Sequence, residues 1–381
     1  MRKVLIVSCF IDKIENARPY LAYKFFRNNY DVKVIYSEFS HTFKKYIKYE
    51  DENFIPVKTL GYKRNISFSR ILSHIIFALK IKGIIKKEKP DLIYVTIPPN
   101  AVAYSVIKIA GKNKEKKVII DIVDIWPETL PIPIVFKRYF NFFVGWFWKY
   151  LRNYALKRAD YIVCQSNYFT QKLALKGNNV QVIHLAKIIK YYEKPIADVT
   201  SGKAIKIAYL GSMNTITDFD TLLKISKTPG LNNIEIILIG DGERKDWLLS
   251  VLKENNIKYT YFGKIFEEEK KKEILSKCDF GFNGYKSNTE VALSYKSIDY
   301  LSYGLPLINS AKNDTWDCVE KYNIGFNYNE NSVDQLIRNL KTLNDGELVR
   351  MKKNSYQCFL ENFTWDKYKT RMSDILNYLN F

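Results

Sequence analysis

The chain has 381 residues, of which 47% are hydrophobic and 15% aromatic, and its 60 Lys and Arg against 40 Asp and Glu give a net charge of +20. This length and composition predict a large buried core and favour two domains, which excludes disorder over most of the chain. The longest apolar stretches, such as residues 139–148, are interrupted well before the roughly 20 residues that span a bilayer, so we expect no transmembrane helix.

Strand-like apolar runs alternate with helix-length segments along the whole chain. In the first half these runs begin at residues 4, 31, 91, 117, 161 and 180. After a polar stretch without periodicity at 193–203, further runs begin at residues 206, 234, 259, 278, 305 and 324. This alternation is typical of parallel sheets covered by helices on both faces. We therefore expect an α/β chain with two doubly wound, Rossmann-like domains, at 1–195 and 204–363.

The basic excess is confined to the first of these halves. Residues up to 200 carry 35 basic and 16 acidic side chains, a net charge of +19, whereas the remainder has a net charge of +1. Five glycines lie in the first half and eleven in the second. A positive field on one domain attracts a polyanion, either nucleic acid or an anionic membrane surface, and composition leaves that choice open. The near-neutral half, with its glycine-rich turns, suits a small ligand.

The five cysteines are odd in number, widely scattered and never arranged as C-x-x-C, and the chain has only three histidines. This spacing argues against a disulfide scaffold and against zinc, and it favours a reducing cytoplasm. We accordingly expect no metal site and no cofactor.

Three segments of the second half could bind a ligand. The first is GDGERKDWL at 240–248, where Gly240 and Gly242 end a strand and Arg244 lies in the first turn of a helix. Glycines allow close approach of the backbone, helix N-terminal N–H groups favour anions, and an arginine can pair with phosphate. An ordinary turn with an exposed arginine is the alternative.

The second segment is YLGSMNTITDFDTLL at 209–223, in which a strand ends at Gly211-Ser212 and a polar loop follows. This loop could face a diphosphate. Asp218 is predicted to cap the helix that begins near Phe219, and this capping role is favoured over a metal-binding role.

The third segment is YKSIDYLSYGLPLINS at 295–310. Lys296 and Asp299 are three residues apart and are therefore neighbours on one helix face. In one interpretation of this pair, the lysine binds a phosphate and the carboxylate binds a ribose diol. In the other, the two side chains form a surface ion pair.

In this order, and followed by F-T-W-D-K-Y at 363–368, these segments resemble glycosyltransferase family 4, a family of retaining enzymes with the two-domain GT-B fold. The first half is similar too, because VDIWPETL at 123–130 looks like the D-x-W-P-E segment of members that build bacterial surface polysaccharides. The resemblance implies two Rossmann-like domains facing each other across a cleft, with the C-terminal helix, at 364–381, returning to the first domain.

The resemblance also implies roles for individual residues. A nucleotide sugar would lie on the second domain, with Asp299 at the ribose, Lys296 and Arg244 at the diphosphate, and Gly211-Ser212 facing the phosphates. The backbone at Gly263, Lys264 and Ile265 would hold the base. Glu290 is the candidate for the carboxylate that contacts the sugar, although it lies one position from the place typical of the family, which is Val291 here. No metal is implied, since fixed cations and helix N-termini would stabilise the departing diphosphate.

On the first domain the resemblance implies an acceptor site, with Asp124 and Glu128 as candidate catalytic residues and Arg18 near the acceptor. The expected acceptor is a lipid-diphosphate-linked glycan that is extended for capsule, O-antigen or exopolysaccharide synthesis.

A helical stripe of aromatic residues at 136–154 is accompanied only by basic residues, because residues 131–159 contain no acid. Its members are Phe136, Phe140, Phe143, Phe147, Leu151 and Tyr154. This pattern predicts an amphipathic helix seated at an anionic membrane surface, which would make the protein peripheral on the inner face of the cell membrane. Packing of the stripe in the core is the alternative. Residues 66–89, which end in several lysines, are a second candidate for the membrane-facing helix.

Two other functions remain as alternatives. A nucleotide-sugar epimerase of the same fold would need no lipid acceptor and would leave a basic aromatic surface without a role. A nucleic-acid-binding protein is consistent with the net charge and with 28 tyrosines. No DNA- or RNA-binding module is visible, however, so we expect no nucleic-acid partner.

Overall fold

The computed structural model describes residues 1–11, 17–65, 67–111, 116–130, 145–189, 204–231 and 234–381. The chain divides into two compact units, the first formed by Met1–Ile188 with Tyr368–Phe381 and the second by Ile189–Lys367. The expected linker at 193–203 lies outside the described residues.

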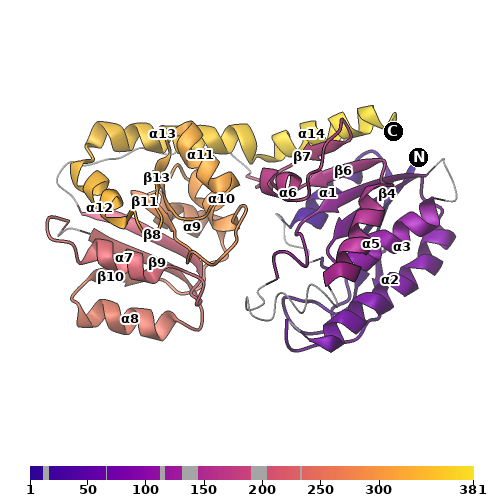
Figure 1. Ribbon diagram of the computed structural model, residues 1–381, viewed down its shortest axis with the longest axis horizontal. Coiled ribbons are helices and arrows are strands. Elements are labelled where there is room, and N and C mark those ends of the chain that lie inside the picture. Colours follow the sequence, from indigo (N-terminus) through magenta and orange to yellow (C-terminus); the bar gives the residue numbers. More distant parts are fainter. Residues whose placement is uncertain (12–16, 66, 112–115, 131–144, 190–203, 232–233) are drawn as a thin grey trace. The chain divides into compact units, whose positions relative to one another are not determined.

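The first unit is built on a seven-stranded parallel sheet with the strand order β3-β2-β1-β4-β5-β6-β7 (Figure 1). Its strands are β1 (Lys3–Ser8), β2 (Asp31–Ser37), β3 (Phe54–Val57), β4 (Leu92–Ile97), β5 (Lys117–Ile122), β6 (Tyr161–Cys164) and β7 (Val180–Val182). The helices of this unit are α1 (Arg18–Phe26), α2 (Phe68–Glu88), α3 (Asn100–Ala110), α5 (Trp146–Leu156) and α6 (Asn167–Lys172). Helix α14 (Trp365–Tyr378) belongs to this unit from Tyr368 onward. Helix α3 packs between α2 and α5.

The second unit has a six-stranded parallel sheet with the strand order β10-β9-β8-β11-β12-β13. Its strands are β8 (Ile205–Ser212), β9 (Ile234–Asp241), β10 (Lys258–Tyr261), β11 (Phe280–Asn283), β12 (Leu307–Asn309) and β13 (Gly325–Asn327). Its helices are α7 (Phe219–Ser226), α8 (Lys245–Glu254), α9 (Glu268–Leu275), α10 (Tyr295–Ser302), α11 (Asp314–Tyr322), α12 (Val333–Thr342) and α13 (Asp345–Asn362). The expectation of two doubly wound α/β domains is confirmed.

All twelve predicted strands are present, and one strand was missed. Strand β3 is only four residues long, contains Pro56 and lies at the edge of the first sheet. Proline cannot donate to a sheet ladder and is tolerated at an edge, so the run does not read as a strand. The predicted cap is also present, because the Asp218 side chain accepts a hydrogen bond from the backbone N–H of Thr221 at the start of α7.

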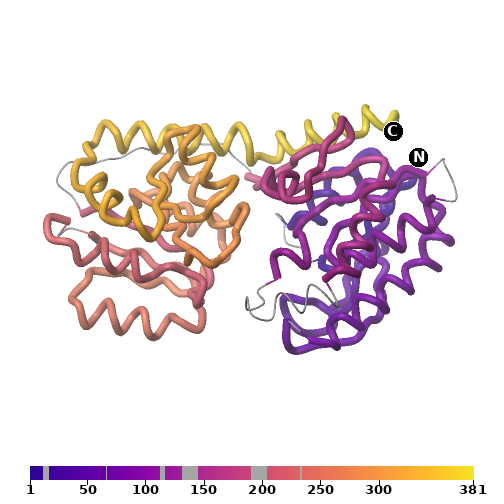
Figure 2. The backbone as a smooth tube through the Cα atoms, viewed as in Figure 1, coloured from indigo at the N-terminus to yellow at the C-terminus, as the bar shows by residue number. Residues whose placement is uncertain are grey.

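The two ends of the chain lie together in the first unit (Figure 2). The Arg2 guanidinium donates to the carbonyl oxygen of Asn380 at 3.3 Å, and the rings of Tyr30 and Phe381 stack with their centroids 5.3 Å apart. These contacts hold the C-terminal segment against the first sheet.

Candidate functional site

The carboxyl ends of β8, β9 and β10 bring four of the predicted glycines together. The Gly240 N–H donates to the carbonyl oxygen of Gly263 at 2.7 Å. A Cβ atom on Gly240 would lie 1.9 Å from the Gly211 carbonyl oxygen, and one on Gly242 would lie 2.3 Å from that of Met213. Gly240 and Gly242 are therefore required for packing between neighbouring loops.

Gly211 and Gly263 differ from these two glycines, because a Cβ atom on either would meet no atom within 4 Å. Both have positive φ angles, +130° and +70°. Their backbone borders open space that a ligand can occupy, as close approach to a diphosphate or a base requires.

Lys264 and Ile265 follow Gly263 on the same loop. The Lys264 ammonium lies 3.3 Å from a carboxylate oxygen of Asp241, a residue that we had not singled out. The N–H of Gly242 and the Lys264 ammonium both lower the pKa of Asp241. Because the Lys264 charge is already paired with Asp241, the backbone of this loop is better placed than its lysine to contact a ligand.

Arg244 caps the N-terminus of α8, at the end of the Gly-Asp-Gly turn. Its guanidinium lies 3.7 Å from the centroid of the Trp247 ring, and its Nε atom is buried without a hydrogen-bond partner. Within the described residues it makes no ion pair. Stacking on the indole fixes the orientation of the guanidinium and leaves its charge available to an anion.

Lys296 lies in the first turn of α10, where its ammonium is 4.1 Å from the centroid of the Tyr285 ring and 4.9 Å from that of Tyr209. It has no carboxylate partner in the described part of the chain, so the alternative interpretation of a Lys296–Asp299 ion pair is wrong. Burial lowers the pKa of Lys296 to about 7. The Tyr209 hydroxyl donates to the carbonyl oxygen of Ser212 at 2.6 Å, which places Lys296 one ring away from the end of β8.

Two further carboxylates predicted for this region belong to the same part of the second unit. Asp299 is half-buried in α10, one turn after Lys296, and Glu290 is exposed in the segment that precedes this helix. The role of either residue at a nucleotide sugar stays a prediction.

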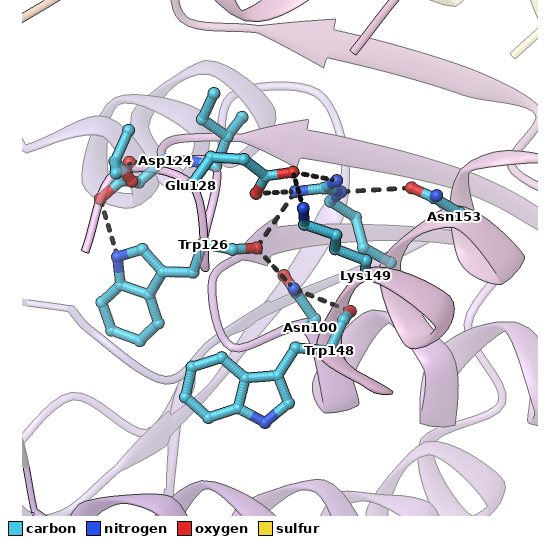
Figure 3. Close-up of polar contacts among 10 residues, drawn as sticks. Asn100, Asp124, Trp126, Glu128, Trp148, Lys149 and Asn153 are labelled. Atoms are coloured by element: carbon cyan, nitrogen blue, oxygen red, sulfur yellow. Dashed lines mark hydrogen bonds and ion pairs between the residues drawn. The ribbon is translucent and has the colours of Figure 1, made fainter. Parts of the chain in front are cut away.

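In the first unit, Asp124 lies just after β5 (Figure 3). Its carboxylate accepts hydrogen bonds from the Ile125 N–H at 2.8 Å, the Trp126 indole N–H at 2.9 Å and the Thr129 hydroxyl at 2.5 Å. Burial raises its pKa, although these three hydrogen bonds act in the opposite direction. Asp124 is thus a rigidly oriented carboxylate, and its catalytic role stays a prediction.

Glu128 does not keep a free carboxylate (Figure 3). Its two oxygens accept hydrogen bonds of 2.7 and 2.9 Å from the Arg152 guanidinium, and the Lys149 ammonium lies 3.8 Å away. Burial would raise the pKa of Glu128, but the hydrogen bond and charge of Arg152 prevail and lower it. Arg152 also donates to the Trp126 carbonyl at 3.1 Å. These contacts give Glu128 a part in positioning this loop, and its catalytic role stays a prediction.

The expectation that Arg18 contacts an acceptor needs correction. Its side chain is 1% exposed, and its Nε donates to both carboxylate oxygens of Asp121, at 2.9 and 2.7 Å. A further hydrogen bond of 2.6 Å reaches the carbonyl oxygen of Ile183. Because α1 begins at Arg18 and turns this side chain toward β5, the residue stabilises the core and is not available to a substrate.

Beside Asp124 lies an apolar pocket that we had not predicted. Its walls come from Ile71, His74 and Ile75 of α2, from Pro99–Ala101, and from the indoles of Trp126 and Trp148. Its cavity volume is about 30 Å³, and its mouth is open to solvent. The His74 and Trp126 rings stack at 5.9 Å, and burial lowers the pKa of His74 to about 3, so this imidazole is neutral. The spacing of Ile71, His74 and Ile75 on one helix face is the sequence signal for this wall of the pocket.

Two segments were candidates for a membrane-facing stripe, and the structure describes only part of the first. Of the predicted stripe, residues 136–144 lie outside the described residues, and within α5 Leu151 is buried while Phe147 is exposed. The second candidate, α2, has an apolar exposed face whose members are 38% to 80% exposed. We define this α2 stripe as Phe68, Leu72, Ile75 and Leu79. Further exposed aromatic residues, Trp146, Phe147 and Tyr150, lie at the start of α5.

No helix in the described ranges is both long and apolar enough to cross a membrane.

Residues 20–186 match the model of the family described as Glycosyltransferase Family 4. This match lies within the first unit and confirms the predicted family resemblance there. No curated protein sequence matches the chain.

Solved structures of similar fold include sucrose-phosphate synthase from Thermosynechococcus elongatus, with a TM-score of 0.71, 12% identity, and coverage of 100% of this chain and 99% of that one. HepE from Anabaena, in complex with UDP, has a TM-score of 0.68 at 12% identity and covers 98% and 99% of the two chains. The lipopolysaccharide outer core galactosyltransferase WaaB gives 0.65 at 13% identity, with coverage of 98% and 99%. The chain therefore has the GT-B fold and carries a glycosyltransferase domain, which identifies the enzyme class as glycosyltransferase.

Proposed function

We propose that this glycosyltransferase moves a sugar from a nucleoside diphosphate sugar to a hydroxyl of a lipid-diphosphate-linked glycan, at the cytoplasmic face of a bacterial membrane. The product would be a repeat unit of capsule, O-antigen or exopolysaccharide. The single observation that carries this proposal is Lys296, a cation without a carboxylate partner among the described residues, beside the carboxyl end of β8. In open α/β sheets, ligands bind at this edge.

The donor half of the proposal rests on the charge and shape of this edge. Arg244 and Lys296 supply positive charge, and Gly211 and Gly263 leave backbone space for phosphates and a base. A departing nucleoside diphosphate gains negative charge as the sugar leaves, and fixed cations stabilise that charge. We infer that no metal ion or other cofactor is needed. The solved structures of HepE with UDP and with UDP-glucose support a nucleotide-sugar donor by analogy of fold.

The stereochemical part of the proposal follows the family resemblance. We infer that the sugar keeps its anomeric configuration, with the acceptor hydroxyl attacking the face from which the diphosphate departs and a leaving-group oxygen taking up the hydroxyl proton. Asp124 would orient the acceptor. The anomeric configuration of the product, measured by NMR coupling constants on the purified glycan, tests this inference directly.

The acceptor half rests on the α2 stripe. Four apolar side chains are exposed along one face of α2, and Lys80, Lys82, Lys86 and Lys87 follow on the same helix. An exposed apolar face followed by basic residues suits an anionic membrane surface, at which a lipid-linked acceptor is held. WaaB, a fold relative, is described as a lipopolysaccharide outer core galactosyltransferase, which supports this part of the proposal by analogy.

The first experiment measures the melting temperature of the protein with UDP, GDP, TDP and CMP in the presence of EDTA, since a ligand that binds the native state stabilises it. A selective increase with one diphosphate, retained in EDTA, is expected. That donor class is then tested for transfer to a lipid-diphosphate-linked sugar. Conversion of the nucleotide sugar to an epimer without any acceptor would instead show an epimerase. Salt-sensitive binding of single-stranded nucleic acid with no response to any nucleotide would contradict the proposal.

A further inference from the structure

Arg70, on α2, is a buried cation surrounded by aromatic rings. Its Cζ atom lies 4.4 Å from the centroid of Trp126, 5.5 Å from that of Phe10 and 5.7 Å from that of Tyr62. One guanidinium nitrogen donates to the carbonyl oxygen of Asn65 at 2.5 Å. Its Nε atom is buried without any hydrogen-bond partner, and the side chain makes no ion pair within the described residues. Burying such a cation costs free energy unless an anion or further hydrogen bonds compensate for the lost hydration.

The groups around Arg70 do not neutralise it. Burial lowers the pKa of His41 to about 4 and that of His74 to about 3, so both imidazoles are neutral at pH 7. Burial and the positive charge of Arg70 also lower the pKa of Lys44. The charge of Asp124 acts on Arg70, but the two oxygens of this carboxylate already accept hydrogen bonds from other groups. The charge of Arg70 is therefore not balanced by these groups, and the His74 Nε2 atom, also buried without a hydrogen-bond partner, can donate to an anion.

The apolar pocket adjoins this cation. Trp126 contributes one ring both to the stack on Arg70 and to the wall of the pocket. On α2, Ile71 follows Arg70 directly and lines the pocket, and Ile75 belongs both to the pocket and to the exposed α2 stripe. Charge, pocket and membrane-facing stripe thus form a continuous path along one helix.

We propose that Arg70 and this pocket bind the junction between phosphate and hydrocarbon in a single-chain lipid phosphate, which is the lipid end of the acceptor. This inference rests on the proposed function and adds the site at which the acceptor's anchor is held. Because the Trp126 indole both stacks on the cation and lines the pocket, a phosphate bonded directly to the chain, as in a prenyl phosphate, suits this short spacing. A diacyl phospholipid places a glycerol and two ester groups between them and fits less well.

The test uses the purified full chain and farnesyl diphosphate as a probe, with affinity measured by calorimetry. Inorganic pyrophosphate carries the same charge without the chain, and farnesol carries the chain without the charge. We expect the Kd of farnesyl diphosphate to be well below that of inorganic pyrophosphate and that of farnesol. Arg70→Gln should weaken its binding by about tenfold or more, because a hydrogen bond to a charged group is lost. Arg338→Gln, a change of an exposed arginine on α12, should leave it unchanged.

A second variant keeps the test decisive if Arg70→Gln does not fold. Ala101→Phe fills the pocket without removing a charge. It should weaken the binding of farnesyl diphosphate about as much as Arg70→Gln does, and it should leave the binding of pyrophosphate unchanged. Equal affinities for pyrophosphate and farnesyl diphosphate would overturn the inference and show a free-anion site. Unchanged binding in folded variants would overturn it as well. Sugar transfer is measured on the same preparations, so that transfer to a lipid acceptor with an unchanged KM in both variants would refute this site while the proposed function stands.

Discussion

The ammonium group of Lys296 lies 4.1 Å from the centre of the Tyr285 ring, where an aromatic face takes the place that a carboxylate would occupy in an ion pair. The ring attracts the cation but does not compensate for its burial, and the pKa of Lys296 consequently falls to about 7. A lysine in this state gains its full charge when an anion binds beside it. The protonation of Lys296 and the binding of a diphosphate should therefore be coupled.

This coupling predicts a pH dependence of donor binding. Above pH 7 the free protein holds Lys296 increasingly in its neutral form, so binding of the diphosphate has to take up a proton. The Kd for the selected nucleoside diphosphate should increase by up to about tenfold per pH unit between pH 7 and 9. Calorimetry in buffers of different ionisation enthalpy would show the proton uptake. Lys296→Met should bind more weakly at pH 7 and should lose this pH dependence, whereas a control, Lys253→Gln on the exposed end of α8, should keep it.

The two kinds of glycine at the donor site should respond differently to substitution. Gly240→Ala would place a Cβ atom 1.9 Å from the Gly211 carbonyl oxygen, and we expect it to lower the free energy of unfolding by about 3 kcal/mol or more. Gly263→Ala meets no neighbouring atom and should cost only about 1 to 2 kcal/mol, because its φ of +70° lies in the left-handed region. Urea denaturation of both variants measures this difference. Equal losses would contradict the packing role assigned to Gly240.

Glu128 should matter for stability more than for the chemical step. Glu128→Gln leaves the Arg152 guanidinium, which is 3% exposed, without a full countercharge, and should destabilise the protein by about 2 to 3 kcal/mol at pH 7. The folded-state pKa of Glu128 is below its usual 4.5, so its contribution is present above pH 4.5 and is lost as the pH falls through the folded-state value. The difference from wild type should therefore shrink in acid. A folded Glu128→Gln protein assayed well below its melting temperature should keep most of its kcat.

Asp124→Asn provides the contrast on the same loop. The amide retains the shape of the side chain, but its nitrogen cannot accept a hydrogen bond from the Trp126 indole or the Thr129 hydroxyl. We expect a fall in kcat of about a hundredfold or more at full donor affinity, in the range of general acid–base or orienting groups. An unchanged kcat in a folded variant would show that Asp124 has no role in orienting the acceptor.

The sequence predicts the fold well because the signals for strands and turns lie in short stretches of neighbouring residues. Buried parallel strands are continuous apolar runs, and each such run became a strand, whereas β3, which holds Pro56 at a sheet edge, lacks that pattern. The glycines that follow β8 and β9 could likewise be identified from the turns that contain them. The lack of a carboxylate partner for Lys296 among the described residues could not be predicted, because it depends on which residues of distant segments meet α10.

The same reasoning explains the errors in the first unit. An acceptor role for Arg18 is compatible with its place at the start of α1, but the burial of its side chain against Asp121 is a tertiary contact across more than a hundred residues. Apolar periodicity shows that a helix has an apolar face and does not show whether another element covers it. This is why the sequence ranks residues 136–154 before α2 as the membrane-facing helix, and the structure describes only residues 145–154 of that first candidate.

The α2 stripe gives the most direct test of membrane association. Leu72 and Leu79 are 38% and 57% exposed, so replacing both with serine should remove apolar contact without disturbing the core. Each leucine contributes about 1.5 to 3 kcal/mol when fully buried, and even half of that for the pair predicts at least about a tenfold loss of partitioning. Sedimentation with vesicles that contain anionic lipid measures this loss, and wild-type protein should not sediment with neutral vesicles. Phe266→Ser is the matched control, because Phe266 is 84% exposed in the near-neutral second unit and should leave sedimentation unchanged. Equal recovery of wild type and the double variant would assign the α2 stripe to a protein partner or a second copy of the chain instead of a membrane.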